Sequence, residues 1–314
     1  HMTVSPSIGI SVFPEDGQTS DVLLKNADAA MYEVKNAGRN GYRFFEAAMN
    51  TSTQRAMNLQ RSLRGAVAGN QLHIHYQPKF DCASGKLLGA EALLRWTHPE
   101  LGPIEPSEFI PIAERSGNIT RIGQWVIKAV CQQIQLWDRA GLAPVKIAIN
   151  LSPIQLRSST LIRDVIDLTR EYGVTPSRLM FEITESVAMQ NAEETMKAVQ
   201  RLQLAGFEMA IDDFGTGYSS LSYLQQFAVR QLKVDRLFVN ELDVKGSKSR
   251  SIVSAIIGLA HALDMEVVAE GEGTAGQLAL LGEMKCDQAQ GFLLARPLGV
   301  GDFSRLMGME PALA

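Results

Sequence analysis

From residue 71 onward, short apolar segments alternate regularly with helical patterns, and this alternation constrains the fold more than any other feature of the sequence. Eight segments have the length and the apolar composition of buried strands. They are Leu72–Phe80, Leu87–Trp96, Val145–Leu151, Leu179–Thr184, Phe207–Asp212, Gln231–Val234, Met265–Ala269 and Gln288–Leu294. Helical patterns separate most of them, for example Gly123–Ala140, Ala192–Ala205 and Ser249–Leu263.

The order of these segments predicts an α/β fold, a (β/α)8 barrel of the TIM type with one antiparallel strand. Only the short turn Cys82–Lys86 separates the first two strands, so we expect them to pair as a hairpin. The other strands are separated by helices, which is typical of a parallel barrel. The alternative is an open doubly wound sheet, but no Gly-x-Gly-x-x-Gly motif follows the first strand.

The first 69 residues follow a different pattern. We interpret residues 1–2, His-Met, as a cloning scar and exclude them from the fold. Residues 3–45 predict a strand, a helix and a strand, a small α+β unit that can bury little core by itself and so resembles the remnant of a larger domain. Residues 46–69 predict one connecting helix, and residues 70–314 the barrel.

Composition excludes several classes of protein. The formal net charge of −4 argues against a protein that coats DNA or long RNA by charge alone. The cysteines are three, an odd number, and form no Cys-x-x-Cys pair, so we expect neither a disulfide framework nor a cysteine zinc site. This cysteine content fits a protein of a reducing compartment. No apolar run is long enough to span a bilayer. We therefore expect a cytoplasmic protein, although a region outside this sequence could anchor the full-length protein to a membrane.

Polar side chains lie at or near the ends of successive strands. They are Glu91, Arg95, Asn150, Glu182, Asp212, Asp213, Lys233, Asp235, Glu270 and Gln290. A single Asp or Asn after a strand commonly caps the next helix. In a barrel, however, the carboxyl ends of the strands meet at one mouth, where crowded carboxylates repel one another unless cations lie between them. Oxygen ligands without His or Cys favour Mg²⁺, Mn²⁺ or Ca²⁺ over zinc.

The spacing of these residues points to a phosphate ligand. Glu91 and Arg95 are four residues apart on one strand and therefore share a face, as do Lys233 and Asp235, which are two apart. Arginine binds phosphate with two parallel hydrogen bonds. We therefore interpret these acid–base pairs as parts of a site in which a carboxylate binds a metal ion and both the metal ion and the arginine bind a phosphate. The alternative is that each pair is only a salt bridge.

Short motifs in a fixed order identify a family. The chain from Gln71 to Leu306 resembles the EAL-domain phosphodiesterases of bacterial cyclic di-GMP signalling. The motifs that carry the resemblance are Tyr76-Gln77-Pro78, Glu91-Ala92-Leu93-Leu94-Arg95, Phe109-Ile110-Pro111, Asn150-Leu151-Ser152, Phe181-Glu182-Ile183-Thr184-Glu185, Asp212-Asp213-Phe214-Gly215-Thr216-Gly217, Leu232-Lys233-Val234-Asp235, Ala269-Glu270-Gly271 and Gln290-Gly291-Phe292.

This resemblance implies a barrel, often dimeric, that hydrolyses cyclic di-GMP to linear 5′-pGpG with two Mg²⁺ or Mn²⁺ ions. Its implied metal ligands are Glu91, Asn150, Glu182 and Asp212, with Asp213 and Asp235 for a second ion. Its implied catalytic residues are Glu91, Lys233, which orients or helps to deprotonate a water, and Glu270, a ligand or base beside that water. Its implied substrate-binding residues are Gln77, Leu94, Arg95, Asn150, Asp235 and Phe292, and Glu185 is implied to brace the loop Asp213–Ser220.

One motif departs from the family pattern. The family usually has Ala-Glu-Gly-Val-Glu-Thr after the seventh strand, whereas this chain has Ala269-Glu270-Gly271-Glu272-Gly273-Thr274. Gly273 takes the place of the second glutamate and Glu272 lies one position early, where its side chain points elsewhere unless the loop shifts. Because the implied metal ligands all remain, we expect reduced activity and not its loss.

The first 45 residues resemble the carboxyl-terminal part of a GGDEF (diguanylate cyclase) domain, through Ser7-Ile8-Gly9-Ile10-Ser11, Ala27-Asp28-Ala29-Ala30-Met31-Tyr32 and Lys35-Asn36-Ala37-Gly38-Arg39-Asn40. The Gly-Gly-Asp-Glu-Phe signature is missing, so no cyclase activity is expected. The full-length protein is expected to carry upstream GGDEF or sensory domains. The leading hypothesis is a phosphodiesterase. The alternatives are a catalytically weak or inactive cyclic di-GMP receptor and a scaffold that pairs chains.

Overall fold

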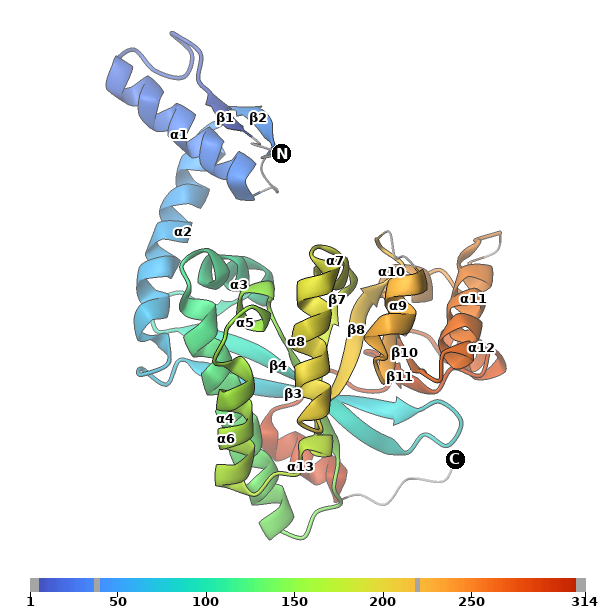
Figure 1. Cartoon of the computed structure of the whole chain (residues 1–314). Coiled ribbons are helices and arrows are strands. Elements are labelled where there is room, and N and C mark those ends of the chain that lie inside the picture. The colour runs from blue at the N-terminus through green and yellow to red at the C-terminus, as the bar shows by residue number, and fades with distance from the viewer. Residues whose placement is uncertain (1–5, 37–39, 218–220, 245, 309–314) are drawn as a thin grey trace. The chain divides into compact units, whose positions relative to one another are not determined.

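The computed structural model describes residues 6–36, 40–217, 221–244 and 246–308 (Figure 1). It divides into two units. The first contains the chain up to Gly69 together with Ser107–Ser116, and the second contains Asn70–Pro106 and the chain from Gly117 onward.

The first unit contains a parallel pair of strands covered by a helix. Strands β1 (Ser7–Ile10) and β2 (Gly41–Phe44) pair in parallel, and helix α1 (Ser20–Asn36) connects them. Its core is small: Ala29 and Ala30 of α1 pack with Met49 of helix α2 (Ala47–Ala66). The predicted strand, helix and strand are confirmed. Helix α3 (Pro106–Arg115) belongs to this unit, where its Arg115 lies over the ring of Tyr32.

The second unit is a closed barrel in which, among the described residues, eight strands form the wall. In spatial order they are β3 (Leu72–Asp81), β4 (Leu87–His98), β6 (Lys146–Asn150), β7 (Leu179–Thr184), β8 (Glu208–Phe214), β9 (Gln231–Val234), β10 (Glu266–Glu270) and β11 (Gln288–Gln290). Strand β3 is antiparallel to both its neighbours, β4 and β11, and the other adjacent pairs are parallel. The predicted barrel with one antiparallel strand is confirmed, and the open sheet is excluded.

Helices lie around this barrel (Figure 1). They are α4 (Asn118–Arg139), α5 (Pro153–Leu156), α6 (Leu161–Tyr172), η1 (Pro176–Arg178), α7 (Glu185–Met189), α8 (Ala192–Leu204), α9 (Leu221–Phe227), α10 (Arg236–Val239), α11 (Ser249–Ala262), α12 (Ala275–Glu283) and α13 (Val300–Met307). Tyr76 of β3 packs against Trp137 of α4 and Phe303 of α13, so aromatic side chains attach these two helices to the antiparallel strand. No helix within the described ranges has the length and apolar character to cross a membrane.

Two details of the barrel differ from the sequence-based prediction. Strand β5 (Gly102–Ile104) pairs with β4 outside the barrel and was not predicted, because three residues are too few to form a recognisable pattern. The last strand was predicted to run to Leu294 but ends at Gln290. The Gln290 carbonyl accepts a hydrogen bond from Gly271 N–H, and a Cβ at Gly291 would collide with Glu272. The loop after β10 therefore ends the strand.

Candidate metal and catalytic site

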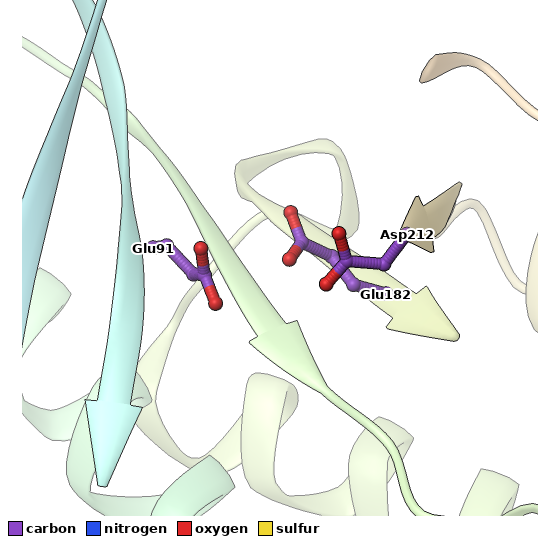
Figure 2. Close-up of side chains that lie close together, drawn as sticks. All are labelled: Glu91, Glu182 and Asp212. Atoms are coloured by element: carbon purple, nitrogen blue, oxygen red, sulfur yellow. The ribbon is translucent and has the colours of Figure 1, made fainter. Parts of the chain in front are cut away.

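Three carboxylates from three strands of the barrel converge at one place. Glu91 of β4, Glu182 of β7 and Asp212 of β8 each offer an oxygen that lies within 4.8 Å of those of the other two (Figure 2). All three side chains are buried. Asn150 and Glu182 are partners in the β6–β7 register, and Thr184 and Asp212 in the β7–β8 register, so the parallel pairing brings these residues to the same end of the barrel.

The ammonium group of Lys233 is bound by this cluster. Its Nζ lies 2.7 Å from Glu182 Oε2, 3.2 Å from Glu91 Oε2, 3.1 Å from Asp212 Oδ1 and 2.8 Å from Glu270 Oε1. The lysine is 1% exposed. Burial acts to lower its pKa, but the four carboxylates outweigh burial and hold the pKa of Lys233 well above its ordinary value. Lys233 is therefore charged in this arrangement.

A second lysine holds Glu182 from the other side. Lys79 of β3 donates from Nζ to Glu182 Oε1 at 2.7 Å, and it is 4% exposed. Both oxygens of Glu182 are thus bound by lysine ammonium groups. Sequence reasoning did not select Lys79. The one available signal was its position two residues after Gln77, which places both on the same face of β3.

Amide groups complete the surroundings of Glu91. Asn150 donates from Nδ2 to Glu91 Oε1 at 2.6 Å, and Gln290 donates from Nε2 to Glu91 Oε2 at 2.7 Å. Burial acts to raise the pKa of Glu91, but Lys233, Lys79 and these two amides lower it to about 2. Glu91 is therefore ionised throughout the physiological range of pH.

The charges in the cluster do not balance. Glu91, Glu182, Asp212 and Glu270 are four acids, and Lys79 and Lys233 are the two lysines that contact them. Burial raises the pKa of Asp212 well above its ordinary value, and burial also raises that of Glu270. Two further positive charges would neutralise all four acids. The donor set, carboxylate oxygens with one amide, is the set that Mg²⁺ and Mn²⁺ prefer, so these residues fit a divalent cation.

A second acidic group overlaps the first. Oxygens of Asp212, Asp213 and Glu270 lie within 4.8 Å of one another. Asp213 has a φ of 53°, a left-handed conformation that is uncommon for a residue other than glycine. Burial raises the pKa of Asp213, and the nearby Asp235 raises it further through its charge and a hydrogen bond. Asp235 also caps α10, because its Oδ1 accepts from Leu237 N–H at 2.7 Å.

Glu185 holds the loop that follows β8. Its Oε2 accepts hydrogen bonds from the backbone N–H groups of Gly215 at 2.8 Å and Gly217 at 3.2 Å, and its side chain is buried. These contacts fix the backbone immediately after the two aspartates. Residues 218–220 of the predicted loop lie outside the described residues.

The residues predicted to bind substrate are less closely grouped. Gln77 faces Glu91 in the β3–β4 register, and Arg95 Nη1 donates to the Leu94 carbonyl at 3.0 Å. Phe292 is 58% exposed, and the Arg296 guanidinium lies 4.7 Å from its ring centre. Among the contacts of the described residues, none joins Leu94 or Phe292 to the carboxylates. Their roles stay predictions.

Glu272 belongs to neither of the two acidic groups. Its carboxylate is completely buried, and neither oxygen has a hydrogen-bond partner within the described structure. The Gly273 N–H donates to Gln277 Oε1 at 2.8 Å, so the loop is anchored to α12 at the position where the family has glutamate. Burial raises the pKa of Glu272 to about 7. The structure therefore gives no sign that Glu272 replaces the missing glutamate.

This burial predicts a pH-dependent effect of Glu272→Val. The folded-state pKa of about 7 exceeds the ordinary value of 4.5, so unfolding releases protons between these values and the native glutamate destabilises the fold increasingly as pH rises. We expect the valine variant to be more stable than the native chain by about 2–3 kcal/mol at pH 8, with a smaller gain at pH 5. Urea unfolding at both pH values measures this. A gain that is equal at pH 5 and pH 8 would contradict the prediction.

Lys79→Met is expected to destabilise the metal-free protein by about 3–5 kcal/mol, because it leaves a buried carboxylate with one of its two charged partners. The matched control is Lys146→Met, since Lys146 pairs with Glu208 and both are partly exposed, so that pair contributes less than about 1 kcal/mol. Denaturant unfolding in the presence of a chelator compares the two. Equal losses would show that the Lys79–Glu182 pair contributes no more than a surface pair.

Comparisons with known proteins find two family models and several related proteins that are similar to this chain. The model of the EAL domain matches residues 60–297, and that of the diguanylate cyclase, GGDEF domain, matches residues 1–41. The bifunctional diguanylate cyclase/cyclic di-GMP phosphodiesterase MucR of Pseudomonas aeruginosa is 45% identical over 295 residues, which are 94% of this chain and 43% of MucR. The cyclic di-GMP phosphodiesterase PdeR of Escherichia coli is 38% identical over 96% of this chain and 45% of PdeR. The chain thus spans less than half the length of these relatives.

Solved structures show the same similarity. The PaMucR phosphodiesterase in complex with c-di-GMP has a TM-score of 0.75 and 42% sequence identity, and the match covers 78% of this chain and 99% of that one. The EAL enzyme Bd1971 in its cGMP-bound form has a TM-score of 0.77 and 28% identity, over 91% of this chain and 78% of that one.

Proposed function

Because this chain belongs to the EAL-domain family, we propose that it is a metal-dependent phosphodiesterase that hydrolyses cyclic di-GMP to linear 5′-pGpG. The observation that carries the proposal is the charge of the site: four acids from different strands, three of them buried and Glu270 partly exposed, surround one ammonium group. Such a cluster lowers the stability of a fold, so its presence indicates a functional site that binds a ligand. Relatives named cyclic di-GMP phosphodiesterases give the substrate.

The residues divide into two candidate groups of metal ligands. Glu91, Asn150, Glu182 and Asp212 would hold one Mg²⁺ or Mn²⁺ ion, and Asp213 and Asp235 a second. Divalent cations, when bound, lower the pKa of water and stabilise charge on the phosphate oxygens. Asn150 has its amide nitrogen on Glu91, which leaves its oxygen available as a ligand.

The residues that are not metal ligands would position or activate the attacking water, or bind the substrate. Glu270 is the proposed base, because a carboxylate whose pKa is raised by burial accepts a proton more readily than an ordinary one. Lys233 contacts Glu270 directly and would hold the attacking water in line with the phosphorus. Arg95 would bind a phosphate oxygen, and exposed Phe292 would stack on a guanine. Gln77 and Leu94 would complete the substrate contacts. The bond that breaks joins phosphorus to a ribose 3′ oxygen, since the product carries a 5′ phosphate.

Further proposals concern the whole protein. We propose that residues 3–45 are the end of a GGDEF-type domain, that residues 46–69 connect it to the barrel at residues 70–314, and that the protein acts as a cytoplasmic homodimer. A second candidate function is a weak or inactive cyclic di-GMP receptor. The observation that favours it is Gly273, which has no side chain to offer where the family has glutamate.

One assay separates the two candidates. The protein is incubated with cyclic di-GMP and Mn²⁺, and the nucleotides are separated by chromatography, beside a Glu91→Gln variant. The proposal predicts 5′-pGpG from the native chain and none from the variant. Calorimetric binding of cyclic di-GMP without any product would support the receptor instead.

A further inference from the structure

Two cysteines that are distant in sequence lie side by side at the seam of the barrel. Cys82 directly follows β3, and Cys286 precedes β11 by two residues. These strands pair antiparallel, with Phe80 opposite Ala289 and Asp81 opposite Gln288. The pairing continues past the strand ends, because Cys82 N–H donates to the Asp287 carbonyl at 3.0 Å.

The backbone pairing brings the two cysteines to nearby positions on adjoining strands. The pKa of the Cys286 thiol is raised well above its ordinary value, first by a hydrogen bond with the Cys82 side chain and then by burial. Cys286 is buried and donates from Sγ to the Gln288 carbonyl at 3.3 Å, whereas Cys82 is partly exposed. One thiol of the pair is therefore accessible from solvent and the other lies behind it.

The backbone spacing suits a disulfide. The register places Asp287 opposite Cys82, so Cys286 is the diagonal neighbour of Cys82 on the adjoining strand. Neighbouring strands lie about 4.8 Å apart, and disulfide-linked cysteines have Cα atoms about 4.4–6.8 Å apart. Cys82 begins the turn between β3 and β4, one residue beyond the end of β3. The third cysteine, Cys131, is fully buried in α4, and burial raises the pKa of its thiol to about 12. Cys131 therefore serves as an internal control, a cysteine of the same chain that we expect to form no disulfide.

We propose that Cys82 and Cys286 are a redox-sensitive pair, free thiols in a reducing environment, that small disulfides of the glutathione type convert into an intramolecular disulfide. The Cys82 thiolate attacks oxidised glutathione, forms a mixed disulfide and releases one reduced glutathione. The Cys286 thiolate then attacks Cys82 Sγ and releases the second. The protein loses two protons and two electrons, and one glutathione disulfide becomes two thiols. Disulfides in reducing compartments are typically of this transient, sensing type.

The bond would join the first strand of the barrel to the last. It would close a loop of about 200 residues, and disulfides that close long loops restrict the unfolded chain most. The strands that it joins also carry Lys79 and Gln290, which hold Glu182 and Glu91. We expect the oxidised protein to melt on the order of 5–10 °C above the reduced protein.

The test is peptide mapping of the whole chain. The protein is incubated with oxidised glutathione, denatured, alkylated and digested without reductant. The proposal predicts one cross-linked peptide pair containing Cys82 and Cys286, a chain lighter by two hydrogens, alkylated Cys131, and reversal by dithiothreitol. The variant Cys131→Ser is expected to form the bond as the native chain does.

Single variants at the pair complete the test. In Cys286→Ser, glutathione is expected to remain attached to Cys82, and in Cys82→Ser neither a cross-link nor the rise in melting temperature should appear. Persistent glutathione on Cys82 of the native chain, with Cys286 still alkylated, would overturn the proposal. So would a cross-link that includes Cys131.

Discussion

Lys233→Met is expected to lower the turnover of cyclic di-GMP by at least ~10³-fold without weakening the binding of Mn²⁺. The lysine ammonium lies among four carboxylates at distances of 2.7 to 3.2 Å, where it neutralises the same oxygens that a cation would bind. Removing it therefore eliminates a competitor for these oxygens. The same change eliminates the group that we propose holds the attacking water, so binding and turnover should respond in opposite directions.

The measurement is a Mn²⁺ titration by electron paramagnetic resonance beside a turnover assay at saturating Mn²⁺. Lys146→Met is the matched control, because Lys146 is also a barrel lysine paired with a glutamate but belongs to the opposite end of its strand from Asn150. The control should leave both quantities unchanged. If Lys233→Met retained native turnover, Lys233 would have only an electrostatic role in the metal-free fold.

Glu182→Gln is expected to reduce Mn²⁺ affinity by at least ~10²-fold and turnover by ~10³-fold at micromolar metal. Glutamine has the shape of glutamate but not its charge, and Glu182 is the acid that both lysines contact. The variant leaves two buried ammonium groups with fewer carboxylates, which adds repulsion against an incoming cation. The loss of metal affinity should therefore exceed the 10- to 100-fold effect that is typical of outer-shell substitutions, and it corresponds to about 3 kcal/mol or more.

Glu208→Gln provides the control for this variant. Glu208 begins β8, pairs with Lys146 and is partly exposed, so its substitution changes net charge equally without touching the cluster. Calorimetry with Mn²⁺ and a turnover assay over a range of metal concentrations compare the two. If high Mn²⁺ failed to recover any activity in Glu182→Gln while metal affinity stayed native, Glu182 would not be a metal ligand.

The barrel was predictable because its strands are buried on both faces and so form short, nearly continuous apolar runs. Leu179–Thr184 and Gln231–Val234 were predicted with the bounds that the structure gives. Polar residues at the ends of such runs are conspicuous, and parallel pairing then brings them together. For this reason Glu91, Glu182, Asp212, Lys233 and Glu270 could be assigned to one cluster from the sequence alone.

Contacts across the barrel were not predictable in the same way. Lys79 lies on the antiparallel strand and reaches Glu182 on a strand that is not its neighbour, so neither sequence spacing nor register indicates the pair. The burial of Glu272 depends on the turn after β10, where Gly271 has a φ of 81° and interrupts the alternation of the strand. The proximity of Cys82 and Cys286 likewise requires the barrel to be closed, because it depends on the pairing of β3 with β11.

The proposed function requires that the crowded acids at the carboxyl end of the barrel bind divalent cations, which in turn bind a phosphate of the substrate. Anomalous scattering from a crystal grown with Mn²⁺ and cyclic di-GMP would show whether metal ions bind there. We predict manganese peaks in contact with Glu91, Asn150, Glu182 and Asp212, and Lys233 turned from those oxygens toward the nucleotide. A crystal with nucleotide bound, no manganese at these residues and Lys233 still among the four carboxylates would show that these acids are not a metal site.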